Sequence, residues 1–205
     1  MDKKLILIGG GSCAGKTTLS TTMQKVLGVD DTIIIHQDNY FADYSAYDEE
    51  NLKKENFDRP EAYMLEKLRR DVFDILKCKS VLLPIYDFER RRVERLVECN
   101  SDCKYIVLEG LLALYDKLLN ELANLKIFMD IDLDFMLARR ILRDTKERNF
   151  SFESIIDRYL NMVKPSFNEY VLPCRKDADC VLSGNISYSK NDIIKLLHDY
   201  NIIVG

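Results

Sequence analysis

The sequence lacks several features that would each indicate a particular class of protein. It contains no run of about 18 apolar residues, the length that a membrane-spanning helix needs. The N-terminal stretch MDKKLILIGGG has only a short apolar run before its glycines, too short for the core of a signal peptide. The formal net charge is −4, whereas a dedicated nucleic-acid binder is usually basic. We therefore expect a protein that binds neither membrane nor nucleic acid.

Histidine is also scarce, which bears on metal binding and on the cellular compartment. Only two histidines accompany the six cysteines, and the cysteines are scattered without a pairing framework. This pattern disfavours a zinc site and favours reduced thiols. We therefore expect a cytoplasmic location.

What is present indicates a globular chain. The chain has 205 residues, of which 47% are hydrophobic, and it shows no internal repeat, low-complexity segment or obvious linker. We interpret residues 1–205 as one domain with two insertions, a β-hairpin at about 81–98 and a lid at about 139–152.

Short apolar runs and helical patterns alternate along the chain. The apolar or β-branched runs predict buried strands at residues 5–8, 32–36, 105–108, 125–129 and 180–182. The helical patterns predict helices at 16–27, 62–77, 134–148, 151–170 and 190–200, with a long loop or short helices at 41–60. Pro165 is expected to kink or end the fourth of these helices. This alternation predicts an α/β fold with a parallel sheet.

The run from Gly10 to Thr17 matches the phosphate-binding pattern G-x-x-x-x-G-K-[ST] and lies between a predicted strand and a predicted helix. Backbone N–H groups of such a loop surround phosphates, and the helix N-terminus adds positive partial charge. Lys16 can reach the β- and γ-phosphates, and the Thr17 hydroxyl can bind Mg²⁺. The alternative is a glycine-rich turn that matches by chance. The expected nucleotide site comprises Gly10, Gly11, Ser12, Cys13, Ala14, Gly15, Lys16, Thr17 and Thr18.

Two carboxylates follow predicted strands. Asp38 lies just beyond the strand at 32–36, and Glu109 follows the strand at 105–108. Ligands of open α/β sheets bind outside the carboxyl ends of the strands. One acid could therefore steer Mg²⁺, while the other accepts a proton from an attacking hydroxyl. Alternatively, Asp38 is a turn or capping residue, and Glu109 is a cap or an ion-pair partner.

Arginines gather on the predicted helix 134–148. Arg143 lies four residues after Arg139 and three after Arg140, so these side chains can share a face. Held over a triphosphate, they would stabilise the moving phosphoryl group, and the closed lid would exclude water. The alternative is a solvated helix with Arg–Glu pairs.

The stretch PIYDFERRRVER, residues 84–95, combines aromatic residues with four arginines. The flanking segments 81–86 and 93–97 are expected to pair as a hairpin. Tyr86 and Phe88 then share one face, because side chains alternate along a strand. They either wall a substrate site or pack in the core.

Together these stretches resemble the uridine kinase / phosphoribulokinase family of P-loop kinases. The resemblance implies a three-layer P-loop NTPase fold in which helices flank a five-stranded parallel sheet, with a β-hairpin and an arginine-bearing lid. It further implies Mg²⁺-dependent transfer of the ATP γ-phosphate to the 5′-hydroxyl of a ribonucleoside, with uridine as the expected acceptor. The family also includes homo-oligomers, so a homo-oligomer is possible here. The matching segments, from residue 9 to about 184, are GGGSCAGKTT, HQDNYF, NFDRPEAY, PIYDF, VLEGLL, FMDIDLD, ARRILRD-TKER, VKPSF and DADCVLSG.

The family pattern also implies roles for individual residues. Asp38 would be the base near the 5′-hydroxyl, and Thr17 and Glu109 would hold Mg²⁺. Arg143 and Arg148 would approach the phosphates, with Lys16 as a further catalytic residue. The implied substrate residues are Asp38, Phe41, Asp58, Tyr86, Phe88, Arg91 and Arg140, with Asp58 at the ribose hydroxyls and the two later aromatic rings at the base.

Three positions depart from the pattern of the uridine kinases. Arg91 replaces a histidine that faces the pyrimidine, Phe150 stands where a second lid arginine is expected, and Arg158 replaces a glutamine. Arginine has five donors and no acceptor, so Arg91 can satisfy a uracil carbonyl but cannot accept from the amine of cytosine. We therefore expect uridine over cytidine, or an acceptor that carries a carboxylate or phosphate, unless Arg91 points to solvent.

Rival functions lack supporting motifs. A regulatory GTPase would need a guanine-reading N-K-x-D segment, which the chain does not contain. A non-catalytic nucleotide-binding module would have no need of both Asp38 and Glu109 beside the lysine of the loop. Other small hydroxyl acceptors stay open, namely a nicotinamide-type riboside, a sugar phosphate or a vitamin precursor.

Overall fold

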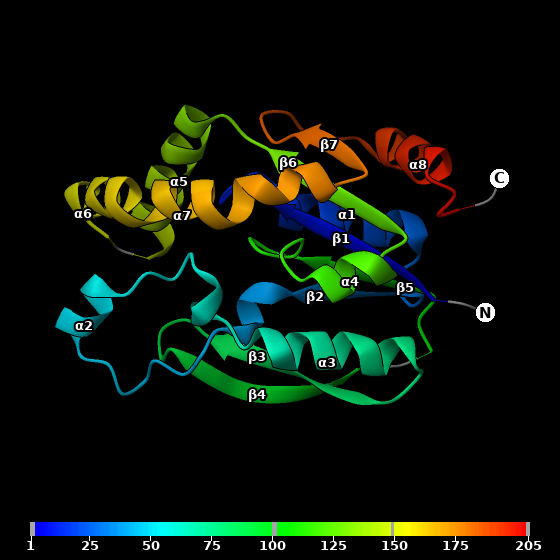
Figure 1. Cartoon of the computed structure of the whole chain (residues 1–205), viewed down its shortest axis with the longest axis horizontal. Coiled ribbons are helices and arrows are strands. Elements are labelled where there is room, and N and C mark those ends of the chain that lie inside the picture. Colours follow the sequence, from blue (N-terminus) through cyan, green and yellow to red (C-terminus); the bar gives the residue numbers. More distant parts are fainter. Residues whose placement is uncertain (1–2, 100–101, 149, 204–205) are drawn as a thin grey trace.

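A five-stranded parallel sheet forms the centre of the computed structural model, which describes residues 3–99, 102–148 and 150–203 (Figure 1). Its strand order is β2-β5-β1-β6-β7, so the predicted fold class is confirmed. The strands are β1 (Lys4–Gly10), β2 (Thr32–His36), β5 (Tyr105–Glu109), β6 (Leu125–Asp130) and β7 (Cys180–Ser183).

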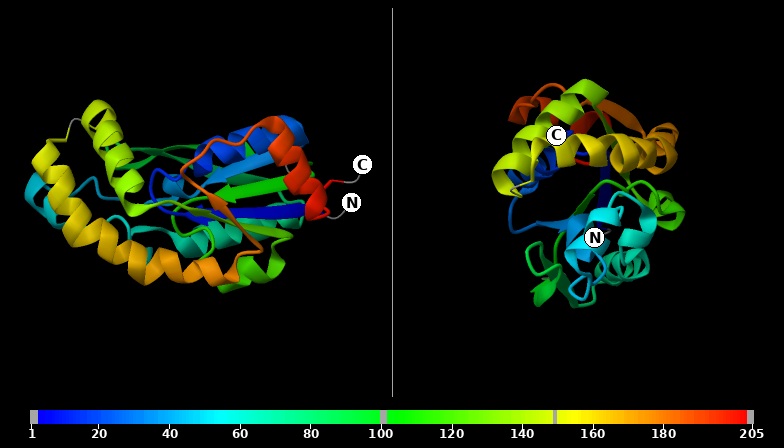
Figure 2. Two further views of the ribbon diagram at one scale, coloured as in Figure 1. Left: turned by 90° about the horizontal axis from the view of Figure 1, so that it is seen from above. Right: turned by 90° about the vertical axis from the view of Figure 1, so that its left-hand side faces the viewer.

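Helices cover both faces of the sheet. Figure 2 shows α1 (Lys16–Leu27) and α8 (Lys190–Asp199) on one side, with α3 (Leu65–Leu76) on the other. The central strand β1 therefore has no exposed side-chain surface from Leu5 to Ile8. Covering on both sides explains why the strands are continuous apolar runs rather than alternating ones.

A long helical run extends from the lid back to the sheet. The lid begins with α5 (Leu133–Glu147), and α6 (Phe152–Arg158) then opens a run that stays helical to Asp177. Pro165 was expected to end or kink this helix. It does not end the helix, which continues through Pro165, and Figure 2 shows that the helical run bends gradually. The turns on either side of Pro165, Tyr159–Val163 and Phe167–Val171, are π-helical. Proline has no N–H to donate, and these wider turns on either side of it allow the helical run to continue.

The predicted hairpin is confirmed as a separate two-stranded sheet of β3 (Val81–Asp87) and β4 (Arg92–Cys99). It packs against α3 and against the 3₁₀ turn η1 (Gln37–Tyr40) that follows β2. Arg91 closes the hairpin with a φ of 56°, and its carbonyl accepts a hydrogen bond of 2.9 Å from the N–H of Tyr44. The hairpin tip is thereby fastened to the segment that follows β2.

Two short helices complete the described fold. The helix α2 (Glu49–Lys54) lies in the stretch for which a loop or short helices were expected, and α4 (Lys117–Leu122) was not predicted. Within the described ranges, no helix is long and apolar enough to cross a membrane.

Candidate active site

The loop between β1 and α1 forms one end of the candidate site. Gly10 has a φ of 135°, and a side chain there would meet the backbone of Met129. Gly15, with a φ of 89°, turns the chain into α1. Both positions require glycine, because other residues rarely adopt these angles. The Nζ atom of Lys16 folds over the loop and donates to the carbonyls of Gly10 (3.1 Å) and Gly11 (2.7 Å).

The two predicted carboxylates lie beside this loop. Glu109 ends β5, next to β1, and its Oε1 accepts from the Thr17 hydroxyl at 3.2 Å. The same oxygen lies 2.7 Å from Nδ1 of His36, which is the residue paired with Glu109 across β2 and β5. Asp38 follows in η1 and faces the cleft. The structure thus brings Lys16, Thr17, Asp38 and Glu109 together.

Burial and charge set the protonation of these groups. The carboxylate of Asp38 is open to solvent in the cleft, yet protein surrounds it on most sides, and this burial raises its pKa together with the charge of Glu109. Burial lowers the pKa of Lys16, while Glu109 and Asp38 oppose that shift. The hydrogen bond to Glu109 raises the pKa of His36. A carboxylate with a raised pKa is a stronger proton acceptor than an ordinary aspartate, which suits Asp38 to general-base chemistry.

Two arginines of α5 and Arg148, which follows that helix, converge on one buried carboxylate. Asp144 is 2% exposed, and Nε of Arg143 lies 2.8 Å from its Oδ1. Arg140 and Arg148 are each 3.6 Å from Asp144. Burial alone would raise the pKa of Asp144, but the hydrogen bond from Arg143 and the three positive charges hold it below its usual value. The predicted lid face is therefore organised by Asp144 rather than by Arg–Glu pairs.

Two arginines of α5 reach the phosphate loop itself. Arg140 is 8% exposed and donates to the Ser12 hydroxyl at 2.9 Å. Arg139 donates to the carbonyl of Cys13 at 3.1 Å and to that of Gly184 at 2.6 Å. Arg139 therefore ties the loop to the end of β7 and does not face the cleft with Arg143, as the helical spacing had allowed.

A cleft of about 1230 Å³ joins these groups to an aromatic end. The rings of Phe41 and Tyr63 stack at 4.3 Å, and those of Tyr86 and Phe88 meet edge-on at 5.3 Å. Phe88 is 51% exposed, so it is not a core residue. Pockets for a single drug-sized ligand typically measure about 300–1,000 Å³, so this cleft is larger than one such ligand needs.

The predicted site residues nearly all line this one cleft, including Arg91. Only Gly10 and Gly11 do not, because Gly10 is the last residue of β1 and both glycines are buried against neighbouring residues such as Met129 and Ile131. The residues that line the cleft are Ser12, Cys13, Ala14, Gly15, Lys16, Thr17, Thr18, Asp38, Phe41, Asp58, Tyr86, Phe88, Arg91, Glu109, Arg140, Arg143 and Arg148.

Several further lining residues were not predicted as site residues. Phe57 and Tyr63 flank the predicted Asp58, and Asp144 lies among the predicted arginines. Phe150 and Arg158 stood out in the sequence only as departures from the family pattern, and both line the cleft. The neighbouring motifs NFDRPEAY and ILRD contain three of these five residues, so the motifs themselves were the available signal.

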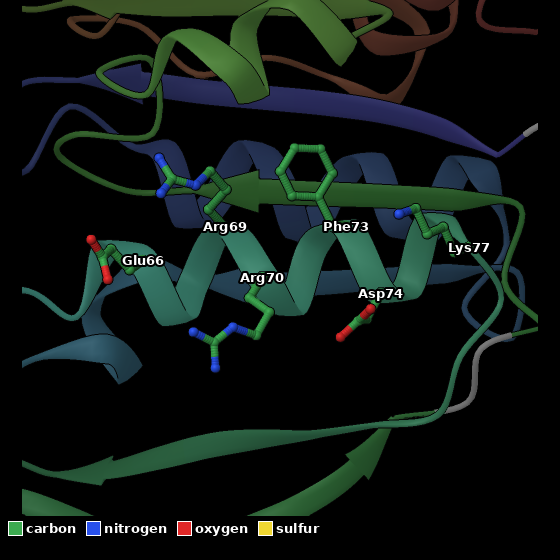
Figure 3. A pocket seen from close by; sticks show the side chains of 6 residues that line it. All are labelled: Glu66, Arg69, Arg70, Phe73, Asp74 and Lys77. Atoms are coloured by element: carbon green, nitrogen blue, oxygen red, sulfur yellow. The ribbon is translucent and has the colours of Figure 1, made fainter.

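A second hollow, of about 450 Å³, lies on α3 away from the phosphate loop (Figure 3). Its lining residues belong to α3 and to Lys77 at the C-terminal cap of that helix, and Figure 3 shows Arg69, Phe73 and Lys77 on one side of it with Arg70 and Asp74 on the other. Arg69 already pairs with Asp116. These side chains do not converge on a common point, so we assign this hollow no function.

The chemistry that suits the large cleft is phosphoryl transfer, which depends on positioning and on charge stabilisation by a phosphate loop, carboxylates and arginines. The class that this arrangement defines is that of the P-loop kinases. A model of the phosphoribulokinase / uridine kinase family matches residues 5–188, and the chain belongs to that family.

Known proteins show the same relationship. The chain is 38% identical over 183 residues to the uridine kinase of Ureaplasma parvum, covering 88% of each chain. It is 38% identical over 199 residues to the chloroplastic uridine/cytidine kinase of Arabidopsis thaliana, covering 95% of this chain but 41% of that protein. The solved structure of phosphoribulokinase from Rhodobacter spheroides superposes with a TM-score of 0.70 at 16% identity, covering 89% of this chain and 70% of that one. At that identity, the structural likeness supports the fold alone.

Asp144 generates a first testable prediction. Replacing it with asparagine removes the charge that holds Arg140, Arg143 and Arg148 together, so we expect kcat to fall by at least ~10-fold, because misplaced charged groups stabilise a transition state poorly. The measurement is steady-state kinetics, with thermal unfolding to show that the variant folds. Asp134→Asn is the matched control, since Asp134 is an exposed acid on the same helix. An unchanged kcat in folded Asp144→Asn would contradict the prediction.

Proposed function

We propose that the protein transfers the γ-phosphate of ATP to the 5′-hydroxyl of a ribonucleoside, with uridine as the first candidate. The observation that carries this proposal is a single cleft with a phosphate loop at one end, aromatic rings and Asp58 at the other, and Asp38 between them. The uridine kinases among the relatives support the choice of acceptor.

At the phosphate end, ATP would lie over the loop and the N-terminus of α1, with Lys16 turned from the loop carbonyls toward the β- and γ-phosphates. Thr17 and Glu109 would hold Mg²⁺, which neutralises phosphate charge when bound. Mg²⁺ usually takes only one or two protein ligands besides phosphates and waters, so a hydroxyl and a carboxylate 3.2 Å apart suit it.

At the reacting centre, Asp38 would accept the proton of the 5′-hydroxyl as that oxygen attacks the γ-phosphate. Arg143 and Arg148 would stabilise the charge of the moving phosphoryl group. Three arginines share the single charge of Asp144, which leaves positive charge that phosphate oxygens can balance.

At the acceptor end, Asp58 would accept hydrogen bonds from both ribose hydroxyls, and Tyr86 and Phe88 would flank the base, with Phe41 behind them. Arg140 would contact the substrate. Its guanidinium donates to the Ser12 hydroxyl of the phosphate loop and the side chain lines the cleft, which supports this role.

The direct test is a coupled assay of ADP release across a panel of nucleosides, a nicotinamide-type riboside, sugar phosphates and vitamin precursors. Turnover of uridine with formation of its 5′-monophosphate supports the proposal. ATP binding without turnover of any acceptor would instead favour a non-catalytic module.

Asp38→Asn tests the base. The amide keeps the shape of the side chain but cannot take the proton, so we expect kcat to fall by at least ~10²-fold with ATP affinity retained. Steady-state kinetics and nucleotide titration measure the two quantities. Near-normal turnover would remove Asp38 from the mechanism.

Arg91 tests the choice between pyrimidines. Arg91→His restores a group that can accept from the amine of cytosine, so the ratio of kcat/KM for uridine to that for cytidine should fall about 10-fold. Arg90→Ala is the control, because Arg90 belongs to the same turn but pairs with Asp87 and does not line the cleft. If the parent turns over uridine and cytidine equally, and Arg91→Ala does the same, then Arg91 does not discriminate between the two pyrimidines.

Four further proposals concern the protein as a whole. We propose that the chain acts as a single kinase domain, that it resides in the cytoplasm, that it assembles as a homo-oligomer and that it does not bind nucleic acid. The net charge of −4 supports the last point, and the cysteine pattern supports the location.

A further inference from the structure

The short helix α2 lies beside the cleft without a core of its own. It has six residues, and none of its side chains is buried. A helix this short is not stable by itself in water, and packing of an apolar face normally supplies the missing stability. Other contacts must therefore hold α2, and with it the segment that leads to Phe57 and Asp58 on the cleft wall.

The strongest of these contacts comes from Arg158, the last residue of α6. Its guanidinium donates to the carbonyl of Glu55 at 2.9 Å and to that of Lys53 at 3.1 Å, with a longer contact of 3.4 Å to Leu52. These carbonyls belong to the C-terminal end of α2, where a helix has no internal donors. A cation at that end is also favoured by the helix dipole.

The same side chain contacts the cleft wall. The guanidinium carbon of Arg158 lies 5.6 Å from the centre of the Phe57 ring. Arg158 itself is half-buried and lines the cleft. One side chain therefore joins the lid helix α6, the end of α2 and an aromatic ring next to Asp58.

An independent tie joins the same segment to the same helical run. The Asn56 side chain donates to the hydroxyl of buried Ser166 at 2.8 Å and accepts from the backbone N–H of Asp58 at 3.0 Å. Figures 1 and 2 both show α2 beside α6 at the end of the molecule that lies farthest from the termini. The wall that carries Asp58 is thus anchored at two points to the helical run that begins with α6, once at Arg158 and once at Ser166.

We propose that Arg158 is a positioning residue for the acceptor: it caps α2 and so holds Phe57 and Asp58 in place on the cleft wall. Only one part of this inference rests on the proposed function, namely that the molecule in contact with this wall is the phosphoryl acceptor. A glutamine, which the family pattern expects here, has a single amide group as donor and a shorter side chain. It cannot bond three carbonyls and cover the ring at once, so the arginine gives this chain a firmer acceptor wall.

The experiment uses the full chain and two readouts, with Arg158→Ala, Arg158→Lys and Arg158→Gln. The first readout is trypsin cleavage after Lys53 and Lys54, which are exposed but held in α2. Without any ligand, cleavage there should be at least ~10-fold faster in Arg158→Ala, because a locally unfolded helix is the form that a protease cuts. Arg158→Lys keeps the positive charge but loses the planar set of guanidinium donors, so its cleavage rate should lie between those of Arg158→Ala and the parent.

The second readout is kinetic. Arg158→Ala should raise KM for the acceptor by about 10-fold and leave KM for ATP within about 2-fold, because only the acceptor wall is loosened. Arg175→Ala is the matched control: Arg175 lies on the same helical run but pairs with exposed Asp130, and its loss should change neither readout.

Each outcome decides the inference. Unchanged cleavage in folded Arg158→Ala overturns the cap, and faster cleavage with an unchanged acceptor KM overturns the positioning role. If the parent enzyme phosphorylates a different acceptor, the proposed function fails, but the same two readouts with that acceptor still test Arg158. Arg158→Lys serves if Arg158→Ala does not fold.

Discussion

The register of three adjacent parallel strands determines where the reactive groups lie. Ile8 of β1 pairs with Glu109 of β5, and Glu109 pairs with His36 of β2, so β2 and β5 end at one level and β1 continues from there to Gly10. The phosphate loop, the carboxylate that bonds Thr17 and the turn that carries Asp38 all start from this edge. A parallel sheet places the carboxyl ends of its strands at one edge. Residues that follow different strands therefore become neighbours in space even when they are far apart in the sequence.

Charge is then distributed unequally along the cleft. The phosphate end gathers Lys16, Arg143 and Arg148 around two acids of the strand edge and the buried Asp144. The aromatic end has rings and Asp58, and Arg91 and Arg158 line the same cleft. The positive charges are thus local, which is how an acidic chain presents a surface that suits a polyanion.

Site residues within one short motif were predictable from the sequence, and those that depend on contacts between separate segments were not. The phosphate loop, Asp38 and Glu109 each sit directly after an apolar strand, so local pattern and position along the sheet agreed. Tyr63 joins the site by stacking on Phe41, and Arg158 joins it by bonding the carbonyl of Glu55, 103 residues earlier, and no periodicity encodes either contact. The helix α4 buries a single leucine, too little to show a helical pattern, and the π-helical turns around Pro165 depend on packing along the whole run.

The absence of buried side chains from α2 has a consequence for how this site can diverge. Substitutions on α2 do not disturb the packing of the core, because its position depends on carbonyl groups that every residue possesses. The phosphate loop has no such freedom, since Gly10 abuts the backbone of β6. Sequence change can therefore accumulate on α2 without a cost in core packing, while a side chain at Gly10 would collide with the neighbouring strand.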